Sequence, residues 1–326
     1  MIYDGRVVIL SDYLINQKIM ILSIIIPVYH CEKCLVPLHE RIVQTVSTLD
    51  DITDYEVIFV EDGGQDGSWE TIEMLAHQDN HVRGIQFSRN FGQHCSITAG
   101  IELCKGDWAV VMDCDLQDCP EDIVHLWKKA QEGYDVVNAR RQARQDSWWR
   151  KTSSRVYHII LEWLSGLSYD PQVANFRIVS RKVISAYNSM QETSRTFGGQ
   201  VQWLGFATSY IDVQHESRYE GKSAYTFRKL FGAAIEVITS YSNKPLKLSI
   251  GLGIAISFFA AMASIWIIIR SFYWGIPVLG WASLMVSIWF LGGVIIANLG
   301  IIGLYIGKIY DETRKRPIYV ISKRVN

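Results

Sequence analysis

Two aspartates separated by one residue stand directly after an apolar run that ends at Met112. Asp113 and Asp115 would lie at the carboxyl end of a buried strand, and Pro120 soon afterwards suits the first position of a helix. Paired carboxylates provide the hard oxygen ligands that Mg²⁺ or Mn²⁺ prefers when it carries substrate phosphates. A surface turn with two solvated acids has the same pattern, so the rest of the chain must decide between the two interpretations.

Further polar residues follow other expected strands. A β-branched run at 21–29 indicates a strand buried on both faces, residues 55–60 indicate a second buried strand, and residues 82–87 indicate a third strand. A helix is expected after each of them. This alternation predicts βαβ units, hence an α/β fold with a mostly parallel sheet and helices on both faces. Ligands of such sheets bind at the carboxyl ends of the strands, where four residues should converge: Tyr29, Asp62, Arg89 and Asp113.

Composition narrows the classes of function. The chain has 326 residues and a net charge of -1, so no basic excess favours nucleic acid as a partner. Cys31 and Cys34 have no second pair at zinc-ribbon spacing, and we expect reduced cytosolic thiols. Charged residues interrupt the first 19 positions, which form no signal peptide and are treated as an extension without an assigned role. A cytoplasmic domain is expected over residues 20–243.

A basic and aromatic stretch follows this domain's fifth expected strand. Arginines are interleaved with Trp148 and Trp149, and a helix is expected near 147–165. Such a helix can lie at a membrane surface, with its rings at the level of the lipid headgroups. An ordinary solvated helix with its tryptophans packed inward is the alternative.

Two charge-free spans, at about 248–269 and 283–307, are each long enough to cross a bilayer. Cations flank both outer ends, whereas the connection carries only Arg270, so both termini of this integral inner-membrane protein are expected in the cytoplasm. Glycines in the second span would allow close helix packing within one chain or in a homo-oligomer. Two transmembrane helices are therefore expected within 244–308, followed by a basic cytoplasmic tail over 309–326.

The combined motifs resemble glycosyltransferase family 2, and within it the branch that makes polyprenyl-phosphate sugars, including dolichyl-phosphate mannose synthases and bactoprenol glucosyltransferases. The similarity runs from about residue 20 to the end of the chain. It rests on the following segments: 26–29 with Glu32, 61–63, 88–92, 113–118, 176–177 and 242–246. The resemblance implies the GT-A fold, followed by a two-helix transmembrane hairpin.

The resemblance also implies roles for individual residues. Asp113 and Asp115 would be the catalytic pair, and with Gln117 they would ligate Mg²⁺ or Mn²⁺ on the donor diphosphate. The donor would be held by the following residues: Pro27, Tyr29, Glu32, Asp62, Asp113, Cys114, Arg218 and Lys222. Lys222 would replace a family lysine at the position of Ala224. The alternative interpretation of the loop that carries these residues is a solvated linker. The acceptor phosphate would be bound by Arg140, Arg150 and Ser154.

These features together predict an inverting transferase that moves a sugar from a nucleotide-sugar donor to undecaprenyl phosphate at the cytoplasmic membrane face. The lipid-linked sugar would serve the modification of a cell-envelope glycan such as O-antigen. Direct transfer to a glycan or lipid-linked oligosaccharide is an alternative, which would need a general base such as Asp118. A catalytically inactive membrane scaffold is the non-enzymatic alternative.

Overall fold

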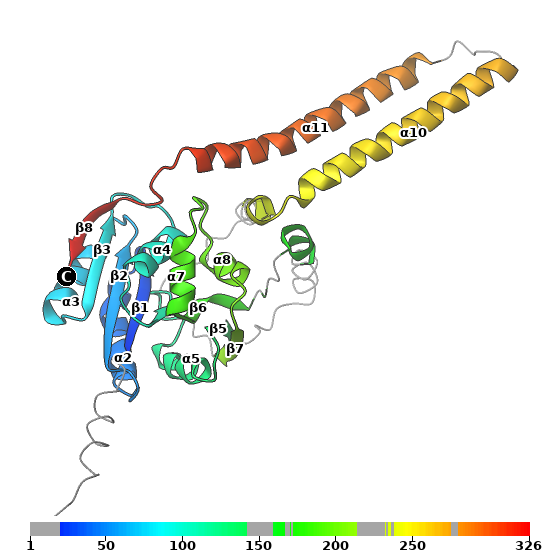
Figure 1. The fold of residues 1–326 in the computed structure, drawn as a ribbon. Coiled ribbons are helices and arrows are strands. Elements are labelled where there is room, and N and C mark those ends of the chain that lie inside the picture. The colour runs from blue at the N-terminus through cyan, green and yellow to red at the C-terminus, as the bar shows by residue number, and fades with distance from the viewer. Residues whose placement is uncertain are drawn as a thin grey trace, which may run out of the picture. The chain divides into compact units, whose positions relative to one another are not determined.

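The β-branched runs form the centre of an eight-stranded sheet in the part of the chain described by the computed structural model (Figure 1). That part comprises residues 20–141, 159–166, 172–213, 238–274 and 280–326, with the single positions 170, 232, 234 and 235. The chain divides into two compact units. The first is formed by residues within Met1–Gln145, Asp170–Ser223 and Pro317–Asn326, and the second by residues within Asp146–Tyr169 and Ala224–Arg316.

The first unit contains a parallel core of four strands. β1 (Ile21–Val28) pairs in parallel with β2 (Asp54–Glu61) on one side and with β4 (Trp108–Val111) on the other, and β3 (Val82–Phe87) extends the sheet beyond β2. The carboxyl ends of these strands therefore share one edge, as the sequence predicted. The short connections after β1, β2 and β4 reach this edge, which is where side chains for a ligand site can gather.

The remaining strands complete a mixed sheet. β6 (Val173–Ser180) runs antiparallel to β4, β5 (Val136–Arg141) runs antiparallel to β6, and β7 (Thr208–Val213) lies parallel to β5. At the opposite edge, β8 (Ile321–Val325) pairs antiparallel with β3. The segment 309–326, expected as a basic tail, thus contains a strand that had not been predicted. Its side chains are mostly exposed, so it lacks the apolar run that reveals a buried strand in a sequence.

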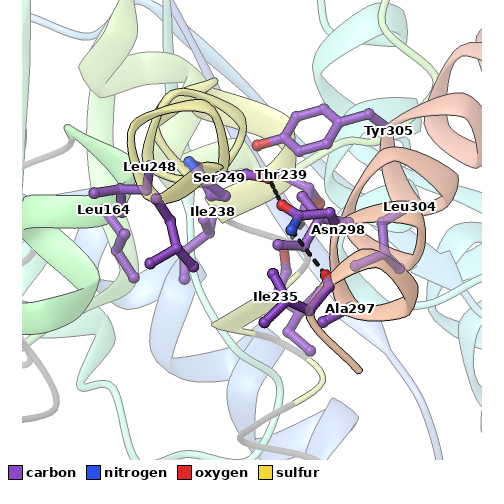
Figure 2. Close-up of a pocket in the computed structure, with 14 residues that line it drawn as sticks. Leu164, Ile235, Ile238, Thr239, Leu248, Ser249, Ala297, Asn298, Leu304 and Tyr305 are labelled. Carbon is purple, nitrogen blue, oxygen red and sulfur yellow. Dashed lines mark hydrogen bonds between the residues drawn. The ribbon is translucent and has the colours of Figure 1, made fainter. Parts of the chain in front are cut away.

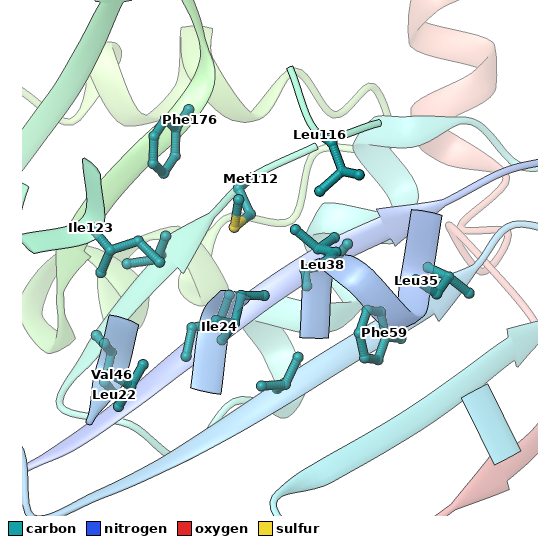
Figure 3. Packing of buried hydrophobic residues seen from close by; sticks show 14 of the residues in the cluster. Leu22, Ile24, Leu35, Leu38, Val46, Phe59, Met112, Leu116, Ile123 and Phe176 are labelled. Carbon is teal, nitrogen blue, oxygen red and sulfur yellow. The ribbon is translucent and has the colours of Figure 1, made fainter. Parts of the chain in front are cut away.

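Helices cover both faces of the sheet. Alternate residues of β1 point to opposite sides: Ile24 and Ile26 belong to one buried cluster, whereas Ile25 belongs to the other. The first cluster, seen in Figure 3, contains residues of α2 (Glu32–Val46), α3 (Ser68–Gln78) and α5 (Ile123–Ala130). The second contains residues of α4 (Gln93–Leu103), α7 (Arg181–Ser189) and α8 (Phe197–Trp203). Of these helices, α7 had not been predicted.

The second unit contains two long apolar helices, α10 (Lys244–Trp274) and α11 (Trp281–Thr313). Segments Lys244–Ala263 and Ser287–Thr313 are long and apolar enough to cross a membrane, and none of their length is buried inside the protein. Both helices extend beyond the predicted spans. A hydrogen bond between Ser249 Oγ and Asn298 Oδ1 joins them, which satisfies two polar groups that lipid could not.

Candidate active site

A cleft of about 640 Å³ opens at the carboxyl ends of the central strands of the first unit. Its walls come from the ends of β1, β2 and β4, the start of α2 and the loop that follows β3. The lining residues are Pro27–Cys34, Asp62, Asp66, Asn90, Gly92, Gln93, Ser96 and Asp113–Asp115. The predicted set of Pro27, Tyr29, Glu32, Asp62, Asp113, Cys114 and Asp115 thus lies in one cleft, whereas Arg89 is not among its lining residues.

Asp62 holds one wall of this cleft in place. Its two carboxylate oxygens accept hydrogen bonds from the backbone N–H groups of Phe91 (2.7 Å) and Gly92 (2.9 Å). Burial raises the pKa of Asp62, although these two bonds oppose the shift. Asp62 was expected to bind the donor, and its carboxylate accepts hydrogen bonds from the loop over residues 88–92. The structure therefore gives this aspartate a definite part in shaping the cleft.

Gly63 permits this contact between loops. Its φ is +66°, a conformation that favours glycine, and a Cβ at this position would lie 2.2 Å from the backbone carbonyl carbon of Arg89. The acid followed by glycine at 62–63 is therefore explained by geometry: the acid binds the neighbouring loop and the glycine lets that loop approach.

The loop that carries Asp113 and Asp115 is anchored by buried side chains on either side of them. Met112 and Leu116 are buried in the core (Figure 3). Leu116 adopts a φ of +60°, which is rare for a branched side chain and is typical of functional sites held by surrounding packing. Asp115 Oδ1 accepts a hydrogen bond from the backbone N–H of Gln117 at 3.2 Å. These contacts hold both carboxylates at the rim of the cleft.

Several carboxylates lie close together around Asp113. Burial, and then the charges of Asp118 and Asp115, raise the pKa of Asp113 to about 7, although Arg141 and a hydrogen bond from Asn175 oppose the shift. Gln93 Nε2 donates to Asp113 Oδ1 at 2.6 Å. Asp118 is buried and binds Arg141 through Oδ1 at 3.0 Å, while its Oδ2 has no hydrogen-bond partner among the described residues. A cation at the rim would relieve this repulsion.

The donor set fits a divalent ion that is shared with a ligand. Among the described residues, no group of three or more His, Cys, Asp and Glu side chains could hold a metal by itself. Asp113 and Asp115 supply two carboxylates, and Mg²⁺ commonly takes its other ligands from substrate phosphates and water. Gln117 is buried and does not line the cleft, so its predicted place as a metal ligand remains a prediction.

The cleft is also lined by an aromatic ring that is half exposed. Tyr29 is half exposed, and its ring meets the edge of His30 at 4.2 Å between centroids. Cys31 Sγ donates to the backbone carbonyl of Cys114 at 3.2 Å, and this contact links the end of β1 to the aspartate loop. A hydrogen bond with Cys114, followed by burial, raises the pKa of Cys31, so this thiol is not activated as a nucleophile.

The cationic residues that were predicted to bind phosphate are only partly described. Arg140 forms an ion pair with Asp170, with 3.0 Å between Nε and Oδ2, and its guanidinium lies 4.8 Å from the ring centroid of Tyr210. Arg150, Ser154, Arg218 and Lys222 lie outside the described residues. The roles assigned to them by resemblance remain predictions.

Two residues of the site were missed by sequence reasoning. Gln93 contacts Asp113 from the first turn of α4, and Asn175 contacts it from β6. Each adjoins a segment that carried the resemblance, since Gln93 follows 88–92 and Asn175 precedes 176–177. The sequence therefore pointed to the segments beside them. Their contacts with Asp113 could not be predicted, because those contacts depend on how distant segments pair in the sheet.

The second unit contains an apolar groove of about 420 Å³. It lies between α10, α11 and the residues before α10, and Figure 2 shows the side chains that line it. Leu164, Ile238 and Leu252 are among its apolar walls. The polar groups of Ser249 and Asn298 bond to each other, and Tyr305 Oη donates to the carbonyl of Ser242 at 2.6 Å. The groove is therefore suited to an apolar chain.

Comparison with known proteins gives a consistent picture. Residues 23–190 match the family model described as glycosyl transferase family 2. The chain is 36% identical to undecaprenyl-phosphate 4-deoxy-4-formamido-L-arabinose transferase from Proteus mirabilis, over 95% of each chain. It is 33% identical to the SfII prophage-derived bactoprenol glucosyl transferase of Shigella flexneri, over 93% of this chain and 98% of the other.

Solved structures resemble it more distantly. One is glucosyl-3-phosphoglycerate synthase from Mycobacterium tuberculosis, crystallised with Mn²⁺ and uridine-diphosphate-glucose. The two chains share 15% identity, the match covers 73% of this chain and 83% of that one, and the TM-score is 0.45.

Proposed function

The chain belongs to glycosyltransferase family 2, and from this premise we propose that it transfers a sugar from a nucleotide-sugar donor to a polyprenyl phosphate, with undecaprenyl phosphate as the acceptor. The observation that carries the proposal is the cleft that gathers Tyr29, Asp62, Asp113 and Asp115 at the carboxyl edge of the sheet. An exposed ring suits a nucleobase, and a rim of carboxylates suits a diphosphate that arrives with a divalent cation.

The donor is held by residues of the cleft in this proposal. Tyr29 stacks on the base, Asp62 maintains the wall beside it, and Asp113 and Asp115 hold Mg²⁺ or Mn²⁺ on the diphosphate. When bound, the ion neutralises charge on the departing nucleoside diphosphate. Arg218 and Lys222 are proposed as further donor contacts, and Arg150 and Ser154 as contacts of the acceptor phosphate.

The reaction needs little acid–base chemistry. A phosphate monoester has its second pKa near 6, so the acceptor is already mostly dianionic at pH 7. A phosphate oxygen attacks the anomeric carbon as the bond to the donor diphosphate breaks, and the configuration inverts. No proton has to move, so the protein's task is to orient the two substrates and exclude water. This agrees with the absence of a histidine among the proposed catalytic residues.

The second unit supports a lipid acceptor. Two helices can cross a membrane, and the groove between them and the preceding residues is apolar (Figure 2). An isoprenoid chain matches such walls, because burial of apolar surface is favourable and requires no polar partner. The relatives named for undecaprenyl phosphate and bactoprenol point to the same acceptor class. We place the cleft and both termini on the cytoplasmic side, where nucleotide sugars are available.

A product assay tests the proposal. Full-length protein in detergent is given undecaprenyl phosphate and, in turn, radiolabelled UDP-, GDP- and dTDP-sugars with Mg²⁺ or Mn²⁺. The expected product is a single sugar that extracts into organic solvent and is released by mild acid, and EDTA should abolish its formation. A labelled polymer or oligosaccharide would instead support direct transfer to a glycan. No labelled product with any donor would overturn the proposed activity.

A further inference from the structure

The last residues of the chain form part of the sheet that carries the cleft. β8 pairs with β3 in antiparallel register, with Ile85 opposite Arg324, and Figure 1 shows the two strands side by side at the sheet edge. Asn326 Nδ2 donates to the carbonyls of Ala76 (2.7 Å) and Val82 (3.0 Å), which fixes the end of the strand. This segment follows directly on the membrane helix α11 in the sequence, so it continues the second unit's chain into the first unit's sheet.

The residues just before β8 contact the loop that walls the cleft. The backbone N–H of Ser88 donates to the carbonyl of Val320 at 3.0 Å. The ring of Tyr319 stacks on Phe87, with centroids 5.0 Å apart and planes at 13°. Phe87 in turn meets the edge of Phe91 at 5.7 Å. A continuous set of contacts thus runs from Tyr319 to Phe91, whose N–H is bound by Asp62 in the cleft.

Tyr319 also contacts α4, the helix that follows the loop over 88–92. Its hydroxyl donates to Glu102 Oε2 at 2.5 Å. Glu102 lies in α4, the helix whose first residue, Gln93, binds Asp113. One side chain from the end of the sequence therefore braces both the loop over 88–92 and the helix that follows it.

We propose that Tyr319 and strand β8 position the Ser88–Gly92 loop of the cleft, so that the segment following the membrane helices helps to shape the donor site. Tyr319 lies outside the cleft lining, and it acts through Phe87 and Phe91. It is therefore a positioning residue. The link to donor binding rests on the proposed function, whereas the link to the loop rests on the contacts alone.

Three full-length variants test this inference. Tyr319→Ala removes the ring and the hydroxyl, and Tyr319→Phe keeps the stacking ring. Tyr55→Ala is the matched control, because Tyr55 stacks on His81 at 4.3 Å near the other end of the strands, away from the loop. Hydrogen–deuterium exchange of the Phe91 and Gly92 amides reports on the loop directly, and exchange in β1 reports on the rest of the fold.

We expect Tyr319→Ala to accelerate exchange at Phe91 and Gly92 about tenfold. The variant loses the stacking of Tyr319 on Phe87 and the hydrogen bond of its hydroxyl to Glu102. Exchange in β1 should not change, Tyr319→Phe should restore most of the protection, and Tyr55→Ala should leave the loop as in the wild type. Unchanged loop exchange in Tyr319→Ala, or equal acceleration throughout the sheet, would overturn the inference.

Nucleotide affinity provides the second measurement. UDP, GDP and dTDP are titrated with Mn²⁺ into the wild type, and the nucleotide that binds best is titrated into the variants. Tyr319→Ala should weaken it about tenfold through the displaced loop, and Tyr319→Phe and Tyr55→Ala should not. Equal affinity in Tyr319→Ala would overturn the link to the donor site. A wild type that binds none of the three would count against the proposed function, and the exchange experiment would still decide whether Tyr319 positions the loop.

Discussion

At the scale of single residues, Asp113 and Asp115 share a loop but have different neighbours. Asp113 accepts hydrogen bonds from the side chains of Gln93 and Asn175 and lies close to Asp118. Asp115 lines the cleft and accepts a bond from the backbone of its own loop. Asp113 is thus held by residues of α4 and β6, and Asp115 accepts a hydrogen bond from within its own loop. We expect both to be needed for activity, for these different reasons.

Replacement of Asp115 by alanine should lower kcat about a thousandfold, since an ion that neutralises a departing diphosphate is worth several kcal/mol. The measurement is the initial rate of lipid-linked sugar formation at saturating donor and metal. Asp122→Asn is the matched control, because it removes one charge from the nearby helix start, outside the cleft lining. An Asp115→Ala variant with near-normal turnover would contradict the assigned role.

The raised pKa of Asp113 predicts a pH-dependent effect on stability. Its pKa is about 7 in the fold, against an ordinary value of 3.8. Protonated Asp113 therefore stabilises the fold at low pH, and this contribution disappears as the pH rises through about 7. Asn cannot ionise, so Asp113→Asn in EDTA should raise Tm more at pH 8 than at pH 4.

Thermal unfolding at both pH values checks this prediction. Mn²⁺ should raise the Tm of the wild type at pH 8 and should have little effect on Asp113→Asn, because only the wild type offers a second carboxylate. An equal change of Tm at the two pH values would show that Asp113 is not the group that titrates.

At the scale of elements, the cleft is built from loops that lock onto one another. The turn after β2 binds the loop after β3 through Asp62, and Gly63 allows the close approach. The loop after β4 is joined to the end of β1 through Cys31. The cleft therefore has a defined shape because the turns hold each other, in addition to their attachment to the sheet.

Gly63→Ala should destabilise the protein and weaken nucleotide binding by tenfold or more. Alanine at φ +66° costs about 1–2 kcal/mol in backbone strain, and its Cβ would also collide with the backbone of Arg89. Gly133→Ala isolates the effect of backbone strain, since Gly133 has a φ of +101° and no atom of the described residues lies within 4 Å of the added Cβ. The control should lower Tm and leave nucleotide affinity unchanged. Equal affinities in the two variants would contradict the packing argument.

The apolar groove of the second unit gives a prediction for the acceptor. Ala297 lines the groove, whereas the neighbouring Ile296 is exposed on α11. Ala297→Trp should fill part of the groove and raise the KM for undecaprenyl phosphate about tenfold, because the ring occupies apolar surface that the lipid chain would otherwise bury. Ile296→Trp adds the same ring at the exposed position and should leave the KM unchanged. The KM for the donor serves as the internal check, and equal KM values for the lipid in the two variants would argue against the groove.

At the scale of the whole molecule, the chain combines a nucleotide-binding sheet with two helices suited to a bilayer. The apolar surface of the helices is exposed, and only lipid or another apolar surface would cover it favourably in the cell. From the charge pattern around the helices we propose that both termini lie in the cytoplasm. The orientation can be tested without separating the two units.

Cysteine labelling of intact cells with a membrane-impermeant maleimide tests this orientation. Tyr273→Cys introduces a thiol near the connection between the helices, and it should be labelled from outside once the outer layers of the envelope are opened. Arg314→Cys lies just after α11 and should react only after the inner membrane is permeabilised. The six native cysteines fall between positions 31 and 119 and should behave like Arg314→Cys. The reverse pattern would overturn the topology.

The sequence by itself determined those features that depend on local pattern. The run over 21–29 specified a buried strand because burial on both faces demands apolar residues at every position. The aspartates after Met112 were assigned to a strand end because polar residues stop such a run where the chain leaves the core. The two spans were evident because crossing a bilayer demands an uninterrupted apolar length.

The tertiary structure alone decided which distant residues meet. β6 runs antiparallel to β4 and brings Asn175 to Asp113, and β8 returns to the edge of β3 and brings Tyr319 to Phe87. Arg140, expected to bind phosphate, pairs with Asp170. Strand direction and partner choice depend on backbone hydrogen bonds between segments far apart in the chain. Backbone groups are nearly the same at every residue, so local periodicity does not encode which segments they will join.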